Sequence, residues 1–171
     1  SYQAVGMTGG GTVSNCVFRD NTGTASAPEG GSGVFASGAG NVITHCAFSN
    51  NTINVSGNSV RHGAAVCVAD SADCAIDNCL FARNALGAGN QPKYGTAVRF
   101  GSKSTGRVRN CLFLENSGTG TDTRGALALV GSGAVDVENC TFVGNSTSTE
   151  NCAGLYADGN ANVVNCLLAD N

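Results

Sequence analysis

A nine-residue signature recurs six times along the 171 residues of this chain. Its pattern is Val/Ile-x-Asn/His-Cys-x-Phe/Leu-x-x-Asn, and successive cysteines of the pattern lie 26 to 33 residues apart. These cysteines are Cys16, Cys46, Cys79, Cys111, Cys140 and Cys166. A period of this length is typical of a solenoid, in which each repeat buries its apolar side against the next. The chain is therefore predicted to be one domain, residues 1–171, made of six coils.

Each repeat contains three short runs in which apolar and polar residues alternate. In the fourth repeat these runs are 95–100, 107–109 and 111–113, and a period of two is typical of β-strands. The composition agrees with short strands joined by turns, since the chain has 25 Gly and charged residues make up only 12% of it. An all-β parallel β-helix of about six coils, each with three short strands, is predicted. Alternation places these pairs inward on the first strand: Val5/Met7, Val34/Ala36, Val66/Val68, Val98/Phe100, Ala128/Val130 and Leu155/Ala157.

Asparagines recur at two corners of the predicted coil. Asparagine tolerates a left-handed backbone, and its amide can bond to the copies above and below. Stacked asparagine columns are therefore expected at both corners. The first column is Asn15, Asn78, Asn110, Asn139 and Asn165, with His45 as a substituted bend residue in coil two. The second is Asn21, Asn51, Asn84, Asn116, Asn145 and Asn171.

Apolar residues also fall at positions that alternation turns outward. Aligned apolar columns on the surface indicate contact with a partner. Neither end of the chain carries a capping element, and uncapped coils expose strand edges. Two explanations stay open for the ends: a piece of a longer array, or head-to-tail stacking. A homo-oligomer or filament is expected, with these outward contacts: Phe35, Leu127, Leu129 and Tyr156 on the first strand, and Leu80, Leu112, Leu114, Val143 and Leu167 on the third.

Three charged residues share one outward position of the second strand in consecutive coils: Asp77, Arg109 and Glu138. They allow two interpretations. One is an ion-pair ladder that holds the register of the coils. The other is the groove of a carbohydrate-active enzyme. The alternating sign of the charges favours the ladder, so no catalytic residue is assigned on the leading interpretation.

Other kinds of site receive little support. No cofactor is expected, and no cysteine or histidine spacing predicts a metal site. The net charge of −3 gives no electrostatic reason to expect nucleic acid. No apolar stretch is long enough to predict a transmembrane helix. Cys67, outside the signature, is expected to point outward, where it could be a reactive thiol or form a link to another chain.

The repeats resemble the polymorphic outer-membrane proteins of chlamydiae. Those proteins pair Phe-x-x-Asn with Gly-Gly-Ala-Ile/Leu/Val. Phe-x-x-Asn appears here from Phe18–Asn21 to Phe142–Asn145, and looser copies of the second motif include Gly63–Val66 and Gly95–Val98. The three-strand coil is also similar to right-handed β-helix proteins in general, polysaccharide lyases and hydrolases among them. The resemblance implies a right-handed β-helix.

Two functional hypotheses follow. The leading one is a non-enzymatic extracellular or cell-surface β-solenoid, structural or adhesive, that assembles end to end or laterally into fibres or a stalk. Partners would be recognised by the variable loops at 22–30, 52–62, 85–94, 117–124 and 146–152. The alternative is a polysaccharide lyase-like or hydrolase-like enzyme, or a glycan-binding module, that uses Asp77, Arg109 and Glu138.

Overall fold

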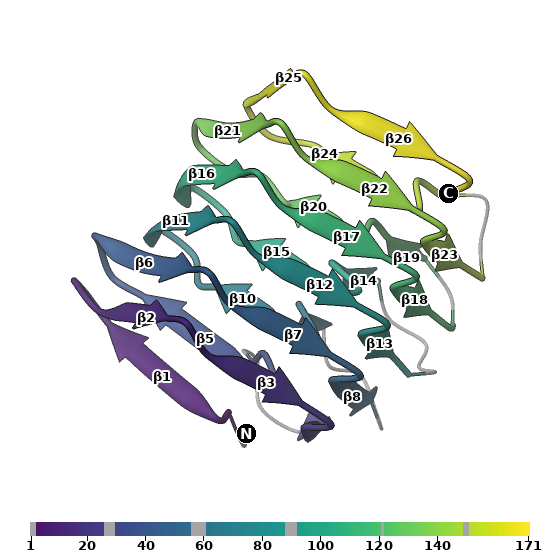
Figure 1. The fold of residues 1–171 in the computed structure, drawn as a ribbon, viewed down its shortest axis with the longest axis horizontal. Coiled ribbons are helices and arrows are strands. Elements are labelled where there is room, and N and C mark those ends of the chain that lie inside the picture. The colour runs from purple at the N-terminus through teal and green to yellow at the C-terminus, as the bar shows by residue number, and fades with distance from the viewer. Residues whose placement is uncertain (1–2, 26–29, 56–60, 88–91, 121, 149–150) are drawn as a thin grey trace.

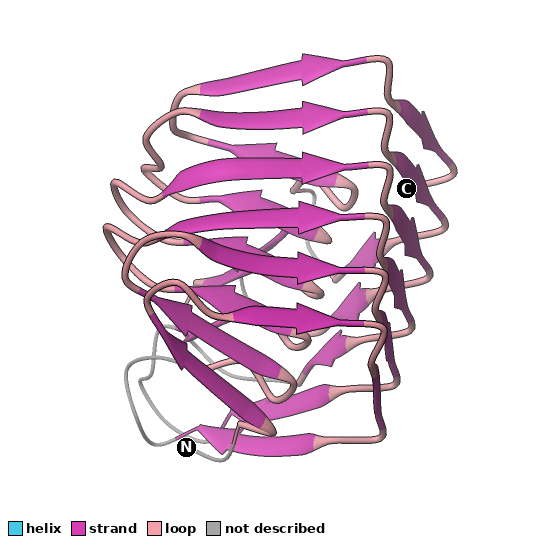
Figure 2. Ribbon diagram, turned by 60° about the vertical axis from the view of Figure 1, so that its left-hand side comes forward, coloured by secondary structure: helices cyan, strands magenta, loops and turns pink. Residues whose placement is uncertain are grey.

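A computed structural model describes residues 3–25, 30–55, 61–87, 92–120, 122–148 and 151–171. These residues form β-strands and no helix, and the chain passes six times through the same three parallel sheets (Figures 1 and 2). Sheet A contains β1 (Val5–Thr8), β5 (Val34–Ser37), β10 (Val66–Val68), β15 (Val98–Phe100), β20 (Leu127–Leu129) and β24 (Leu155–Ala157). Sheet B contains β2 (Thr12–Ser14), β6 (Asn41–Thr44), β11 (Asp73–Asp77), β16 (Thr105–Arg109), β21 (Val135–Glu138) and β25 (Ala161–Val164). Sheet C contains β3 (Val17–Arg19), β7 (Ala47–Ser49), β12 (Leu80–Ala82), β17 (Leu112–Leu114), β22 (Thr141–Val143) and β26 (Leu167–Ala169).

Two smaller sheets are formed by residues of the segments that were predicted to be variable loops. Sheet D contains β4 (Thr22–Ala25), β8 (Thr52–Val55), β13 (Ala85–Leu86), β18 (Ser117–Gly118) and β23 (Ser146–Thr147). Sheet E contains β9 (Arg61–His62), β14 (Lys93–Tyr94) and β19 (Thr123–Arg124). Each of the first five coils thus has one or two strands beyond the predicted three, while the described part of the sixth coil has the predicted three. Positions 26–29, 56–60, 88–91, 121 and 149–150 of the variable segments lie outside the described residues.

The register of the sheets superposes one copy of the signature on the next. In sheet C, Phe48 pairs with Phe18 on one side and with Phe81 on the other, and the pairing continues through Phe113 to Phe142. Their rings stack with centroids 4.6 to 5.1 Å apart. This spacing is that of adjacent strands, so the parallel sheet itself imposes the stack.

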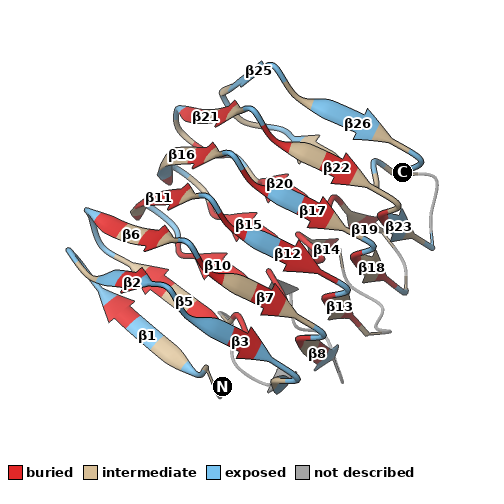
Figure 3. Ribbon diagram, in the orientation of Figure 1, coloured by how far each residue is buried: buried red, intermediate tan, exposed pale blue. Residues whose placement is uncertain are grey.

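The core is a set of apolar columns between the three large sheets. Val34, Ile43, Phe48 and their counterparts in the middle coils are fully buried. The last coil differs, as Figure 3 shows along β25 and β26. Val163 and Leu168 take inward positions there, yet they are 43% and 50% exposed because no described coil lies beyond them.

Coil five corrects the predicted inward pair Ala128/Val130. Val98 and Phe100 pair with Leu127 and Leu129, and these two leucines are fully buried. Ala128 therefore takes the outward position beside Arg99. The prediction of Leu127 and Leu129 as surface contacts is wrong because of a phase shift. Leu127 follows its turn glycine, Gly125, by two residues, whereas Val98 follows Gly95 by three.

The two asparagine corners differ in chemistry. The bend residues Asn15, His45, Asn78, Asn110, Asn139 and Asn165 all have φ between 53° and 55°. Among the described residues no hydrogen bond joins their side chains, which are exposed, so the amide column expected at this corner does not form. Their role is to tolerate the left-handed turn between sheets B and C.

The hydrogen-bonded column forms at the second corner. Each amide nitrogen donates to the side-chain oxygen of the next asparagine, as in Asn84 Nδ2 to Asn116 Oδ1 at 3.0 Å. The same nitrogen also donates to a phenylalanine carbonyl of the previous coil, as in Asn84 Nδ2 to Phe48 O at 3.0 Å. The column runs from Asn21 to Asn171, and Asn51, Asn84 and Asn116 are fully buried. The left-handed residue here is the one before the asparagine, such as Arg83 with a φ of 54°.

Candidate functional site

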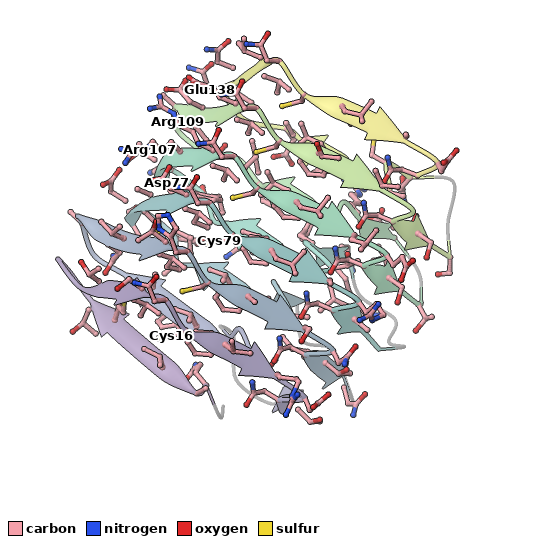
Figure 4. All side chains as sticks on the ribbon, in the orientation of Figure 1. Cys16, Asp77, Cys79, Arg107, Arg109 and Glu138 are labelled. Atoms are coloured by element: carbon pink, nitrogen blue, oxygen red, sulfur yellow. The ribbon has the colours of Figure 1, made fainter. Side chains whose placement is uncertain are left out.

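The charged cluster lies on the outer face of sheet B, where β11, β16 and β21 are adjacent (Figure 4). Asp77, Arg109 and Glu138 are in register, and Arg107 pairs with Asp136. The ion pairs include a diagonal one. Arg107 binds Asp77 at two points, 3.1 and 2.8 Å, while Arg109 binds Glu138 at 3.1 Å and lies 3.8 Å from Asp136. The hydrogen bond from Arg107 to Asp77 raises the pKa of this guanidinium.

Every charged side chain of this arrangement has a partner of opposite sign. Each of the carboxylates Asp77, Asp136 and Glu138 faces a guanidinium, and Arg109 lies between the coils of Asp77 and Glu138. A small pocket of about 320 Å³ is lined by Asp73, Arg107, Arg109 and Asp136, among others. Its polar groups could bind a hydroxylated ligand. The pairing itself is that of an ion-pair ladder across parallel strands.

Replacing Arg109 by glutamine is expected to lower the free energy of unfolding by only about 0 to 1 kcal/mol. The Arg109 and Glu138 side chains are 38% and 30% exposed, so water and salt screen their attraction. Urea denaturation at low and high salt measures the effect, and high salt should reduce it. Lys103→Gln, which removes a positive charge from an exposed turn, is the control. A loss above about 3 kcal/mol would contradict the ladder interpretation.

A groove of about 1020 Å³ follows the corner between sheets B and C. Bend residues such as Asn78 form one side, and the first residues of the sheet C strands, such as Leu80, form the other. Cysteines of the signature also line the groove. In the sequence, each of them follows a bend residue and precedes the first residue of a sheet C strand. The left-handed bend produces the groove, because it turns the chain sharply just before each cysteine.

The signature thiols interact along the axis. Hydrogen bonds with Cys111 lower the pKa of Cys79 and of Cys140. The bonds with Cys140 and Cys79 raise the pKa of Cys111 itself. Burial raises the pKa of Cys46. The protonated thiols donate to backbone carbonyl oxygens of their own coils, as in Cys111 Sγ to Arg109 O at 3.2 Å.

The outer face of sheet C carries exposed apolar side chains. Leu80 and Leu112 are each 36% exposed, Leu167 is 57% exposed, and Leu114 and Val143 are half-buried. Val17, which the sequence reasoning missed, is 72% exposed at the same register position. Its place in the first copy of the signature was sufficient to find it. Five of the six aligned residues at this position are apolar and Thr141 is the polar one; we call Val17, Ala47, Leu80, Leu112, Thr141 and Leu167 the apolar column of sheet C.

Large side chains on the outer face of sheet A contact other parts of the same chain. Phe35 is half-buried and packs on the core. Tyr156 accepts a hydrogen bond of 2.6 Å from Arg124 of sheet E, and this guanidinium lies 4.9 Å from the Tyr156 ring centre. Arg124 also lies over the ring of Tyr94 at 5.5 Å, an arrangement that the sequence did not indicate. Sheet A therefore presents no continuous apolar face among the described residues.

The prediction of an exposed, reactive Cys67 is wrong. Its side chain points outward from sheet A but is fully buried. In the register it lies between Phe35 and Arg99, whose larger side chains occupy the neighbouring coils. An outward position is therefore not an exposed one when both neighbours in the column are large.

Within the described parts of the chain, no group of three or more His, Cys, Asp or Glu side chains is arranged to hold a metal ion. The same residues contain no helix with the length and hydrophobicity needed to cross a membrane.

Comparison with known proteins identifies the repeat family. A family model described as a right-handed β-helix region matches residues 3–171. No curated protein and no solved structure matches the chain significantly. The family match and the stacked parallel sheets agree on the architecture, and the match covers nearly the whole sequence. The chain therefore belongs to the right-handed β-helix family.

Proposed function

We propose that this protein is a non-enzymatic structural or adhesive β-helix of the extracellular space or cell surface, and that copies assemble laterally through the outer face of sheet C. The observation that carries the proposal is the apolar column of sheet C, in which Val17, Leu80, Leu112 and Leu167 are exposed. Aligned apolar residues on a flat sheet are typical of contact surfaces, unlike single exposed apolar residues.

The charges of the two neighbouring sheets support this choice of face. The outward positions of sheet C carry a single charged residue, Arg19, which pairs with Asp20 at 3.2 Å. Sheet B, in contrast, carries the whole ion-pair ladder on its outer face. Charged side chains keep exposed sheets apart. Sheet B is thus the solvated side, and sheet C the side that gains most from being covered.

The occupant that best fits the face is a second copy of the chain. Two such sheets would pack about 10 Å apart and bury leucine against leucine without leaving a charge unpaired. The internal columns support a structural role, since stacked rings and asparagine amides make each coil bind the next. The resemblance of the Phe-x-x-Asn repeats to chlamydial surface proteins supports the extracellular location. End-to-end association into fibres would use the coil ends and is a separate step.

The double variant Leu80→Lys/Leu112→Lys is expected to weaken self-association at least about tenfold, because each lysine places a charge in an apolar contact. Analytical ultracentrifugation over a concentration series measures the dissociation constant, and negative-stain microscopy shows whether fibres form. The control variant Ser14→Lys/Asn162→Lys adds the same charge to exposed outward positions of sheet B. A wild-type protein that stays monomeric at every concentration, or equal weakening by both variants, would overturn the proposal.

The alternative is a carbohydrate-active enzyme or a glycan-binding module at Asp77, Arg109 and Glu138. The observation that favours it is the pocket of about 320 Å³ on this face, which Arg109 lines together with Asp73, Arg107 and Asp136. The ion pairs argue against it, because a substrate that bound these side chains would first have to open the pairs. Screening against acidic polysaccharides distinguishes the two functions. Turnover or binding that Arg109→Ala abolishes would favour the alternative.

A further inference from the structure

The six signature cysteines form one column parallel to the solenoid axis. Each lies just before a strand of sheet C, and its carbonyl accepts a backbone hydrogen bond from the residue that follows the next cysteine, as in Ala47 N to Cys16 O at 2.9 Å. Figure 4 shows sulfur atoms in a row along this side, with Cys16 at its lower end. Neighbouring strands are about 4.8 Å apart, and the thiols inherit this repeat.

The thiols of this column share one orientation. Each of the six donates a hydrogen bond to the carbonyl oxygen two residues earlier in its own coil, as in Cys79 Sγ to Asp77 O at 3.2 Å. Five of them also lie near a carbonyl oxygen of the preceding coil, as in Cys111 Sγ to Ile76 O at 3.7 Å. None of the six is in a disulfide. The thiol groups therefore repeat along the axis in equivalent positions.

The column can be reached from solvent. Cys16 is exposed, and Cys46, Cys79 and Cys111 line the groove of about 1020 Å³ between sheets B and C. These three are only 3 to 4% exposed, so only a small part of each residue reaches the groove. Exposed asparagine amides along the groove can hydrogen-bond the water that an entering ion releases.

We propose that this column binds soft monovalent cations of the Cu(I) class, each held by two thiolates from neighbouring coils. Thiolates are the ligands that select Cu(I). A metal–thiolate bond is about 2.3 Å long, taking zinc as the reference, so two bonds in line span about 4.6 Å, close to the strand spacing. A tetrahedral zinc site needs four ligands around one point, which a single straight column does not supply.

Binding exchanges protons for metal. Two thiols and one monovalent cation give one bis-thiolate complex of charge −1 and release two protons, so atoms and charge balance. Each thiolate binds one ion. A sulfur atom that bound an ion on each side in a straight column would need its two metal–sulfur bonds to point in opposite directions. Six thiols then hold about three ions, in the pairs Cys16–Cys46, Cys79–Cys111 and Cys140–Cys166.

The test uses the reduced full-length chain, titrated with Cu(I) under anaerobic conditions against a chromophoric Cu(I) chelator. Native mass spectrometry should show about three retained ions, pH measurement about two protons released per ion, and X-ray absorption about two sulfur neighbours per copper. Cys152→Ser, which removes an exposed cysteine outside the column, should leave the count unchanged.

Two double variants separate paired sites from general thiol binding. Cys79→Ser/Cys111→Ser leaves two neighbouring pairs and should retain about two ions. Cys46→Ser/Cys111→Ser removes as many thiols but leaves only Cys140 and Cys166 adjacent, so it should retain about one ion. Circular dichroism confirms that each variant is folded. Loss of all copper to the chelator, or equal counts in the two variants, would overturn the proposal.

Discussion

Replacing Asn84 by alanine is expected to lower the free energy of unfolding by about 3 to 5 kcal/mol. The Asn84 side chain is fully buried and takes part in four hydrogen bonds. It donates to Phe48 O and Asn116 Oδ1, and it accepts from the backbone and side-chain nitrogens of Asn51. Alanine removes all four and leaves buried donors and acceptors unpaired, which costs more than the bonds themselves contribute. Urea denaturation followed by circular dichroism measures the loss.

Asn78→Ala is the matched control for this prediction. Asn78 belongs to the same coil but lies at the bend corner, where its side chain is exposed and its φ is 55°. The expected loss is about 1 kcal/mol, from the left-handed backbone alone. Because a solenoid can unfold in parts, amide hydrogen exchange should show the Asn84→Ala effect concentrated in the adjoining coils. Equal losses in the two variants would contradict the buried amide column as a source of stability.

The sequence predicted the internal columns well because they repeat with little variation. Six copies of one signature define which residues superpose, and an apolar residue recurs at each inward position of the signature, as with Phe18, Phe48 and Phe81. The parallel register then follows from the period. What the period cannot determine is the phase of a segment that lies outside the signature. The strand before each signature follows a turn of variable length, so Leu127 and Leu129 were assigned to the wrong side of sheet A.

The surface was harder to predict than the core. Outward alternation identified Leu80, Leu112 and Leu167 correctly as exposed. It failed for Cys67, because burial on an outer face depends on the size of the neighbours in other coils. It also placed Arg107 beside Asp136, although the stronger ion pair runs diagonally to Asp77. Long flexible side chains choose among several neighbours at similar distances, and a one-dimensional pattern does not rank them.

The outer faces of the large sheets, and the corner between two of them, differ in the side chains that they carry. Sheet B carries paired charges, sheet C carries exposed apolar residues, and the corner between them exposes the edge of the thiol column. Each property extends over several coils because one register position is repeated along the axis. In a β-helix, a residue type that recurs at one position of the repeat therefore forms a stripe of side chains along the axis. The candidate sites of this chain are such stripes and not clefts.

The turn that precedes each strand of sheet A gives the second large prediction, that Gly95→Ala lowers the free energy of unfolding by more than about 4 kcal/mol. Gly95 has a φ of 72°, and a Cβ atom there would collide with the carbonyl oxygen of Val98. The backbone cannot move aside freely. Gly95 N donates to Arg124 O at 2.9 Å, and Gly95 O accepts from Gly63 N at 3.0 Å. Relieving the collision would therefore break contacts with the coils on both sides.

Gly10→Ala separates this steric effect from backbone strain. Gly10 has a similar φ of 66°, but nothing lies within 4 Å of the position that its Cβ would occupy. Its expected loss is about 1 to 2 kcal/mol, the cost of a left-handed alanine. Thermal and urea unfolding of the two variants give the difference directly. If Gly95→Ala were no more destabilising than Gly10→Ala, the close approach of neighbouring coils at this turn would not be a constraint, and glycine would be needed there only for its backbone conformation.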